Sequence, residues 1–370
     1  MKILQISSAQ SLGGGERHLA DLANGLARRG HDMHVALRRN SPLLDELKEL
    51  PQENVTTLPL RNSLDAKSAR DLSTLVRRNG IRIVHAHMAR DYPLAAYAVR
   101  MNPGARLIIT RHVLFPLNRL HRVTLSRARI IAVSQAVASQ LRSDRIAPAG
   151  KINVVLNGIN VDRFKKAREG FDRRQFLHGW GLPEDALLVG TVGELTPLKG
   201  PEEFLRAAAR IAQQYPNTYF VIAGIDHSPG NKNRALLAQL IEELNLSHRV
   251  RVVGWLEDLA QLYCALDVFV SASHTESFGL AIAEAMASST AVVATETAGA
   301  KEIIQDGVTG LLIPIADVDR LTESVITLLK DKDRRLQIGV AAQEAVSTQF
   351  DVERMIEQTE KIYRAVLQEK

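Results

Sequence analysis

Residues 268–302 read VFVSASHTESFGLAIAEAMASSTAVVATETAGAKE, and the order of elements in this stretch determines the expected fold. An apolar run typical of a buried strand opens it, and a short polar loop follows at residues 273–276. Small residues at helical spacing then occupy residues 278–287, and a second apolar run covers residues 291–294. Strand, loop, helix and strand in this order predict one βαβ unit, in which the two strands are parallel.

Gly279 stands in the first turn of this expected helix, where no side chain shields the free backbone N–H groups. Helix N-termini of this kind bind anions, because their unpaired N–H donors and the helix dipole both favour negative charge. Glu276 in the loop and Glu284 in the helix add a carboxylate on each side. Two carboxylates would repel a bare phosphate, but they suit a ligand with phosphate in the middle and hydroxyls at both ends, as in a nucleotide sugar.

The segment ESFGL at residues 276–280, with Glu284 eight positions after Glu276, resembles the E-x7-E motif of retaining glycosyltransferase family 4, whose members share the GT-B fold. The resemblance covers nearly the whole chain, and this segment is its most specific part. It implies that Glu284 holds the donor ribose and that Glu276 holds hydroxyls of the transferred sugar. The donor-site residues that it implies in this segment are Glu276, Phe278, Gly279, Leu280 and Glu284. Paired glutamates among small residues also occur on ordinary surface helices, which remains the alternative.

Length and composition are those of an ordinary globular protein. A chain of 370 residues is long enough for two domains, and 45% hydrophobic with 24% charged residues is typical of soluble proteins. The single cysteine, Cys264, excludes an internal disulfide and is expected in the core of a protein from a reducing compartment. The N-terminal MKILQI predicts a strand rather than a signal peptide, and no apolar run is long enough to span a membrane. We therefore expect a cytoplasmic protein.

Charge is distributed unevenly along the chain. Residues 1–165 hold 26 Lys and Arg against 12 Asp and Glu, a net charge of +14, whereas residues 166–370 hold 21 against 29, a net charge of −8. A basic half of this kind suits an anionic membrane surface, at the inner face of which the protein would be peripheral, or an anionic acceptor. Nucleic acid is a poorer partner, since aromatic residues are few and no binding motif is present. Arginines that only solvate a large domain are the alternative.

The first strand, at residues 2–7, leads into a glycine-rich turn and a helix that Gly30 is expected to end. Two details argue against an NAD-binding turn, because His18 stands where the third glycine belongs and Arg38 follows the second strand in place of an acid. Arginine there would suit NADP, but the missing glycine argues against it. In the resembled family this loop lies under the donor diphosphate, which implicates Gly14 and Gly15. A tight turn without a function is the alternative.

Two histidines alternate on the expected strand at residues 82–87, which puts His85 and His87 on one face with His87 at the carboxyl end. Ligands of doubly wound sheets bind outside that end of the strands. The pair resembles the H-x-H of family 4, in which the second histidine approaches the donor sugar, and this role carries over to His87. Arg111 and His112 end the next strand at the same edge. They and His85 are candidate contacts for acceptor or sugar.

An apolar loop at residues 114–118 precedes a segment in which Arg119, Arg122 and Arg129 fall near one face at helical spacing. An apolar tip beside a basic face indicates interfacial binding and would bring a lipid-linked acceptor to this half. A plain surface helix is the alternative.

The second half repeats the plan of strand, loop, helix and strand from residue 187 onward. Lys199, at a helix start, supplies a positive charge for phosphate. The resembled family carries G-R-L-x-x-x-K-G here, with Arg and Lys both on the diphosphate, but this sequence has Glu194 in place of the arginine. Diphosphate binding is therefore expected to depend on Lys199, the glycine turn and the Gly279 helix terminus. Residues 249–255 resemble the family segment beside the nucleotide base.

The resemblance implies two Rossmann-like doubly wound parallel-sheet domains facing each other across a cleft. The N-terminal, acceptor-binding domain is expected at residues 1–165, with an amphipathic C-terminal helix at residues 352–370 packing back on it, and the donor domain at residues 166–351. A charged, glycine-containing linker with a short helix is expected at residues 165–185. Asp317 and Asp319 match a D-x-D pattern of possible metal ligands, but they are predicted to start a helix. No metal is therefore expected.

These observations predict a retaining, metal-independent glycosyltransferase with no cofactor beyond its nucleotide-sugar co-substrate. It would move a hexose or related sugar from a nucleotide diphosphate sugar, UDP first and GDP next, to a hydroxyl of a glycan or lipid-linked acceptor in cell-surface polysaccharide or lipopolysaccharide synthesis. His87, Glu276 and Lys199 are the catalytic candidates. The two glutamates could instead be the acid and nucleophile of a glycosidase, but a dinucleotide-type cleft has no need of a second carboxylate, which argues against this alternative. A nucleotide-sugar isomerase of the same fold, or a non-catalytic nucleotide-sugar-binding module, remains an alternative.

Overall fold

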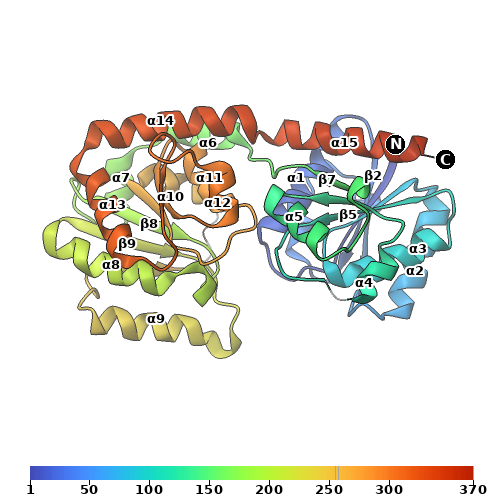
Figure 1. The fold of residues 1–370 in the computed structure, drawn as a ribbon, viewed down its shortest axis with the longest axis horizontal. Helices are drawn as coiled ribbons and strands as arrows, with labels where there is room; N and C mark the ends of the chain where they lie inside the picture. Colours follow the sequence, from blue (N-terminus) through green and yellow to red (C-terminus); the bar gives the residue numbers. More distant parts are fainter. Residues whose placement is uncertain (118, 255, 257, 370) are drawn as a thin grey trace. The chain divides into compact units, whose positions relative to one another are not determined.

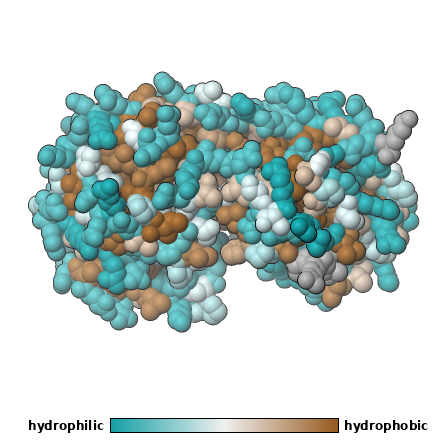
Figure 2. All heavy atoms as spheres, in the orientation of Figure 1, coloured by the Kyte–Doolittle hydropathy of each residue, from teal (hydrophilic) through white to brown (hydrophobic). Residues whose placement is uncertain are grey.

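The computed structural model describes residues 1–117, 119–254, 256 and 258–369, and it divides into two compact units. Unit 1 comprises Met1–Gly158 and Val352–Lys370, and unit 2 comprises Ile159–Asp351. Each unit contains one parallel sheet with helices packed against it (Figure 1). Hydrophilic side chains predominate on the face drawn in Figure 2, in keeping with an apolar core inside each unit.

The sheet of unit 1 has seven parallel strands in the order β3-β2-β1-β4-β5-β6-β7. The strands are β1 (Lys2–Ser7), β2 (Asp32–Arg38), β3 (Val55–Leu58), β4 (Ile83–Ala86), β5 (Arg106–Arg111), β6 (Arg129–Ala132) and β7 (Ile152–Val154). Their residues are buried almost throughout, as expected for parallel strands covered on both faces.

Six α-helices accompany this sheet in the described part of unit 1. They are α1 (Gly14–Arg28), α2 (Ala66–Asn79), α3 (Tyr92–Arg100), α4 (Arg119–Thr124), α5 (Gln135–Ser143) and α15 (Val352–Gln368), with short 3₁₀ turns at Pro42–Glu46, Gln52–Asn54, Ala89–Asp91 and Ala149–Lys151. Helix α15 packs against α1, and its Ile356, Tyr363 and Val366 join Leu22 and Leu26 of α1 in one core. The C-terminal helix is therefore a structural part of unit 1.

The sheet of unit 2 has six parallel strands in the order β10-β9-β8-β11-β12-β13. The strands are β8 (Leu187–Val192), β9 (Thr218–Ala223), β10 (Val250–Val253), β11 (Val268–Ser271), β12 (Ala291–Thr295) and β13 (Leu311–Ile313). Its helices are α6 (Val161–Glu169), α7 (Arg173–Gly179), α8 (Pro201–Gln214), α9 (Lys232–Glu243), α10 (Leu259–Ala265), α11 (Leu280–Ala287), α12 (Ala298–Ile303), α13 (Val318–Lys330) and α14 (Lys332–Gln349), with 3₁₀ turns at Pro197–Lys199 and Pro229–Asn231.

The predicted fold class, two Rossmann-like doubly wound parallel sheets, is confirmed. Strand β1 has the predicted bounds, and the C-terminal helix α15, at Val352–Gln368, lies within the predicted range 352–370. Cys264 lies in the core as expected, and Asp317 caps α13 by accepting a hydrogen bond from the Arg320 backbone N–H, so the D-x-D is a helix start. Within the described residues, no helix is long and apolar enough to cross a bilayer.

The structure corrects two local predictions. Unit 2 starts at Ile159 rather than at residue 166, because α6 packs on α10 and α11. The short helix expected within residues 165–185 is present as α7, where Arg173 is held by the Asp267 carboxylate. Arg129 belongs to β6, where it pairs with Glu369, so it shares no helix face with the arginines before it.

Gly200 gives a test of the packing in unit 2. It has a φ of +65°, and a Cβ atom there would lie 2.0 Å from the carbonyl oxygen of Ala272. We expect Gly200→Ala to lower the free energy of unfolding by about 2–5 kcal/mol, because left-handed strain adds to the displacement of the backbone. The control is Gly230→Ala, where φ is +67° but no atom lies within 4 Å of the Cβ position. In urea unfolding the control should lose only about 1–2 kcal/mol, and equal losses would contradict the close contact.

Candidate active site

The sheet order places a binding edge on unit 1. Strand β1 has β2 on one side and β4 on the other, so the connections that leave β1 and β4 diverge at their carboxyl ends. Such a switch point opens a crevice in doubly wound sheets. Gly14 and Gly15 begin α1 at this edge, and His87 follows β4 there. A Cβ atom on Gly15 would lie 3.4 Å from His112, which follows β5, so the three segments meet.

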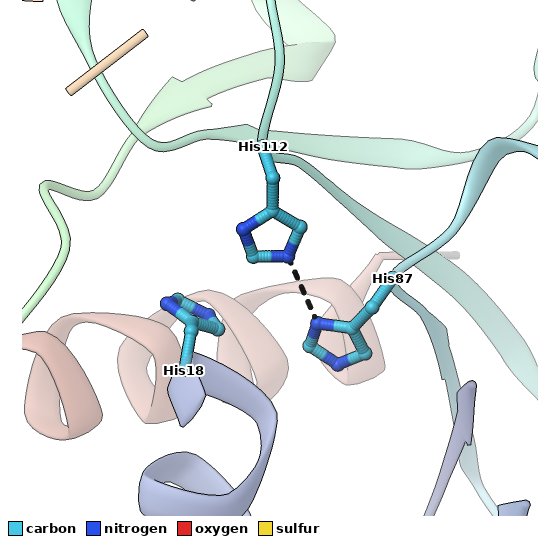
Figure 3. Close-up of side chains that lie close together, drawn as sticks. All are labelled: His18, His87 and His112. Atoms are coloured by element: carbon cyan, nitrogen blue, oxygen red, sulfur yellow. Dashed lines mark hydrogen bonds between the residues drawn. The ribbon is translucent and has the colours of Figure 1, made fainter. Parts of the chain in front are cut away.

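Three histidine rings converge at this edge (Figure 3). His87 Nδ1 and His112 Nε2 lie 3.3 Å apart, and the His18 ring stands edge-on to His112 with 4.8 Å between centroids. Sequence reasoning proposed His87 and His112 but used His18 only to exclude a dinucleotide turn. The helical spacing in α1 contained the missing signal, because His18 lies one turn beyond the glycines that were proposed.

Burial keeps these imidazoles neutral. It lowers the pKa of His18 to about 4, against the opposing effect of a hydrogen bond to Asn157. It lowers the pKa of His87 well below the ordinary value, and the neighbouring His85, His112 and His18 lower it further. The pKa of His112 falls for the same reasons. At neutral pH the rings therefore offer lone pairs and N–H groups rather than charges.

Two of the residues proposed as acceptor or sugar contacts, His85 and Arg111, are held by other groups of the protein. His85 is fully buried in β4, with Nδ1 2.5 Å from the Tyr363 hydroxyl oxygen and Nε2 2.8 Å from the Thr110 hydroxyl oxygen. Both ring nitrogens thus have protein partners. Arg111 is buried as well and donates to the carbonyl oxygen of Phe115. We therefore drop both residues from the candidate acceptor or sugar contacts.

Asp91 is a buried acid at the same edge that sequence reasoning missed. Its Oδ2 accepts a hydrogen bond of 2.8 Å from the backbone N–H of Ser8, at the end of β1. Burial raises the pKa of Asp91 to about 6, because the hydrogen bonds from Ser8 offset only part of the desolvation. The residue holds the loop after β4 against β1.

The corresponding switch point of unit 2 lies between β8 and β11. There Lys199 Nζ forms an ion pair of 2.6 Å with Glu276 Oε1, and the Ser273 hydroxyl donates to the same oxygen at 2.8 Å. Two residues that the sequence proposed separately, 77 positions apart, are thus in direct contact. Glu276 is mostly buried and Lys199 is about a third exposed, so the lysine retains an open side toward solvent.

Helix α11 begins at Leu280, two residues later than predicted, with Gly279 as its N-cap at a φ of +103°. A left-handed φ of this size is costly for any residue with a side chain, which explains the glycine. Phe278 is buried and packs edge-on against Phe350, so its side chain is turned away from any ligand. In the proposed donor segment at residues 278–280, the backbone N–H groups and the half-buried Leu280 remain candidate contacts for the donor.

Glu284 is only 8% exposed and lies on α11, where Oε2 accepts a hydrogen bond of 2.9 Å from the Tyr263 hydroxyl. Tyr263, on α10, was absent from the sequence-based set because nothing in its local sequence marks it. Glu194 is exposed beside Gly193, over which the methylene groups of Lys199 pack. Trp255, in the segment proposed to border the base, lies outside the described residues.

Two family models match the chain. The model described as "Glycosyltransferase Family 4" covers residues 12–163, and the model described as "Glycosyl transferases group 1" covers residues 172–345. The chain belongs to glycosyltransferase family 4. In this family 4 glycosyltransferase the first match contains the three histidines of unit 1, and the second contains Lys199, Glu276 and Glu284 of unit 2.

Similar proteins extend along the whole enzyme. N-acetyl-alpha-D-glucosaminyl L-malate synthase of Bacillus anthracis is 26% identical, with 98% of this chain and 97% of the relative aligned. D-inositol 3-phosphate glycosyltransferase of Corynebacterium urealyticum is 27% identical over 98% and 93%. Among solved structures, Anabaena Alr3699/HepE in complex with UDP-glucose has a TM-score of 0.85 at 25% identity over 99% of this chain and 100% of that one. These likenesses establish a glycosyltransferase with the GT-B fold.

Asp91 gives a pH-dependent test. Its folded-state pKa of about 6 exceeds the ordinary value of 3.8, so between these values the folded chain holds a proton that the unfolded chain has released. The stability that this group contributes therefore falls as pH rises from about 4 to about 6. We expect Asp91→Asn, which keeps an acceptor for Ser8, to gain on the order of 3 kcal/mol over the wild type across this window. Asp45→Asn, at an exposed site, is the control.

Denaturant unfolding at pH 4, 5, 6, 7 and 8 would measure the difference in unfolding free energy between the wild type and each variant. A constant difference between the wild type and Asp91→Asn across this range would contradict a buried carboxyl that retains its proton.

Proposed function

We propose that this glycosyltransferase retains the anomeric configuration and uses a nucleoside diphosphate sugar as donor, with UDP-sugars favoured. The observation that carries the proposal is the Lys199–Glu276–Ser273 cluster at the carboxyl edge of β8 and β11, beside the N-terminus of α11. It combines a cation and free N–H groups for phosphate with a carboxylate for sugar hydroxyls. The similar structure of Anabaena Alr3699/HepE in complex with UDP-glucose supports UDP as the nucleotide part of the donor.

Each residue has a proposed part in the reaction. Lys199 and the first N–H groups of α11 stabilise the negative charge that develops on the departing diphosphate. Glu284, which the Tyr263 hydroxyl orients, holds the ribose hydroxyls, and Glu276 holds those of the transferred sugar. His87, neutral through burial, serves the transferred sugar as a hydrogen-bonding group, with Gly14 and Gly15 at the turn beside it. His112 remains a candidate contact for the acceptor or sugar.

The proposed chemistry needs no covalent intermediate. The bond between the anomeric carbon and the phosphate oxygen breaks, the acceptor oxygen bonds to the same face of that carbon, and the acceptor proton passes to the leaving phosphate oxygen. Lys199 and the helix terminus supply the electrostatic stabilisation for which other enzymes use a metal ion, so we propose that transfer itself is metal-independent. Glu194 places a negative charge near this phosphate site and lowers donor affinity relative to the arginine of the family pattern.

The acceptor class is proposed to be an anionic hydroxyl compound. Two relatives carry names with anionic acceptors, L-malate and inositol 3-phosphate, and residues 1–165 have a net charge of +14. Both a lipid-linked glycan with phosphate and a small hydroxy acid meet this description. The lipid-linked case, in cell-surface polysaccharide or lipopolysaccharide synthesis at the cytoplasmic face of a membrane, is favoured by the exposed apolar residues around α4.

A thermal-shift panel of UDP-, GDP- and ADP-sugars tests the donor site. We expect UDP-sugars to raise the melting temperature of the wild type and Glu284→Gln to bind them about 10- to 100-fold more weakly, because a charge-assisted hydrogen bond contributes about 1.5–3 kcal/mol. Glu242→Gln on the exposed face of α9 is the matched control and should bind as the wild type does. No shift with any donor at millimolar concentration would remove the donor assignment.

Product analysis with the bound donor then separates the alternatives. A transferase yields a glycoside only when an acceptor is present, and its anomeric configuration, read by NMR, matches that of the donor. Sugar rearranged without an acceptor would indicate an isomerase. Donor binding with no turnover on either acceptor class would indicate a non-catalytic binding module.

The segment around α4 is proposed to touch an anionic membrane. Val113, Phe115 and Val123 are 38%, 63% and 74% exposed, and Arg122 and Arg127 are exposed beside them. We expect the protein to co-sediment with vesicles that contain anionic phospholipid, and Phe115→Ser to bind about tenfold more weakly, because burying such a side chain contributes about 1.5–3 kcal/mol. Leu236→Ser, an exposed apolar residue of α9, is the control. Equal sedimentation of all three proteins would exclude this surface.

A further inference from the structure

The histidine cluster of unit 1 has the composition of a metal site. One ring nitrogen from each of His18, His87 and His112 lies within 4.8 Å of one from each of the others (Figure 3). The three residues come from α1 and from the segments after β4 and β5. Within the described residues, no carboxylate or cysteine accompanies them in the group, so the donor atoms are three imidazole nitrogens.

Two buried nitrogens of this cluster lack a partner. Within the part of the chain that the structure describes, Nε2 of His18 and Nε2 of His87 accept or donate no hydrogen bond. Both side chains are at least nine-tenths buried. Buried polar atoms nearly always have a partner, because leaving one unpaired costs about 1–3 kcal/mol. The unpaired Nε2 of His18 is therefore a spare donor atom that an ion bound to Nδ1 of His87 and Nε2 of His112 would use.

The surroundings orient the rings as the outer shell of a metal site does. Nδ1 of His18 lies 2.9 Å from Oδ1 of Asn157, so this nitrogen donates its proton to the amide oxygen and leaves the lone pair on Nε2. The His85 ring packs 4.2 Å from that of His87 and is itself held by Tyr363 of α15. The residues that fix the rings thus come from several segments of unit 1.

We propose that His18, His87 and His112 bind a divalent transition-metal ion, with Zn²⁺ the best match and one coordination position left open. Three imidazoles with an open position form a common zinc geometry, whereas Mg²⁺ and Ca²⁺ prefer oxygen ligands. Two nitrogens at about 2.0–2.1 Å from a tetrahedral ion lie about 3.3–3.4 Å apart, which agrees with the 3.3 Å between Nδ1 of His87 and Nε2 of His112. The ligand nitrogen of His18 lies within 4.8 Å of the other two and moves closer when the ion binds.

The charge balance indicates what occupies the open position. Arg111, next to His112, already contributes one positive charge, and the group contains no carboxylate or thiolate that would compensate the ion. An anionic fourth ligand, such as hydroxide or a carboxylate or phosphate oxygen, therefore stabilises the bound ion. The metal site stands on unit 1 alone, and an ion held there occupies ring nitrogens of His87 and His112, so the ion and the sugar contact proposed above are alternative uses of these side chains.

Cobalt titration of the full chain without an affinity tag tests the site. We expect one Co²⁺ per chain, with the intense visible absorption of a tetrahedral ion, and displacement of Co²⁺ by one equivalent of Zn²⁺. His18→Ala and His112→Ala should each weaken Co²⁺ binding more than about 100-fold, and Asn157→Ala about 10- to 100-fold, the usual cost of losing a supporting outer-shell partner. His248→Ala, an exposed histidine of unit 2, is the matched control and should bind as the wild type does.

A second measurement avoids the risk that a buried variant fails to fold. Micromolar Zn²⁺ should raise the melting temperature of the wild type, an equal concentration of Mg²⁺ should not, and a chelator should reverse the shift. Absence of stoichiometric Co²⁺ binding together with no Zn²⁺ shift would overturn the proposal. Unchanged Co²⁺ affinity in folded His18→Ala and His112→Ala, as judged by near-UV circular dichroism, would overturn it as well.

Discussion

Both units depend on the same constraint, which is that a parallel sheet covered by helices on both faces exposes neither face to solvent. Strands such as β1, β4 and β12 are buried along nearly their whole length, so their side chains must be apolar or fully paired. Polar and reactive groups are then confined to the ends of the strands. In unit 1 this edge collects His18, His87 and Asp91, and in unit 2 it collects Lys199 and Glu276.

The two edges differ in how their polar groups are satisfied. In unit 2 the carboxylates have partners, since Glu276 is bound by Lys199 and Ser273 and Glu284 by Tyr263. In unit 1 burial keeps His18 and His87 neutral, and within the described residues Nε2 of each has no hydrogen-bond partner. The unit 1 edge therefore offers lone pairs, whereas the unit 2 edge offers the cation of Lys199 and paired carboxylates.

Helix α15 illustrates how distant sequence supports the edge of unit 1. Its Tyr363 lies in the core and reaches His85, whose ring backs that of His87. An ion pair from Arg29 and a hydrogen bond from His31 to Glu360 hold the outer side of the same helix. A segment at the end of the chain thus fixes the position of a side chain at residue 87. Amphipathic periodicity predicted that one face of α15 packs against the rest of the protein. Only the tertiary structure shows that Tyr363 on this face contacts the His85 ring.

The sequence by itself determined the element order, the strand cores and the end of each strand at which function lies, because hydrophobic period and turn chemistry are local properties. Together with the resemblance to family 4, these patterns named Lys199, Glu276, Glu284 and His87 as candidates. Only the tertiary structure decided which candidates touch and which are enclosed. It paired Lys199 with Glu276, enclosed Phe278 and His85, and brought His18 to His87 and His112. Those outcomes depend on packing between segments far apart in the chain, and a local sequence pattern does not specify which distant segments come into contact.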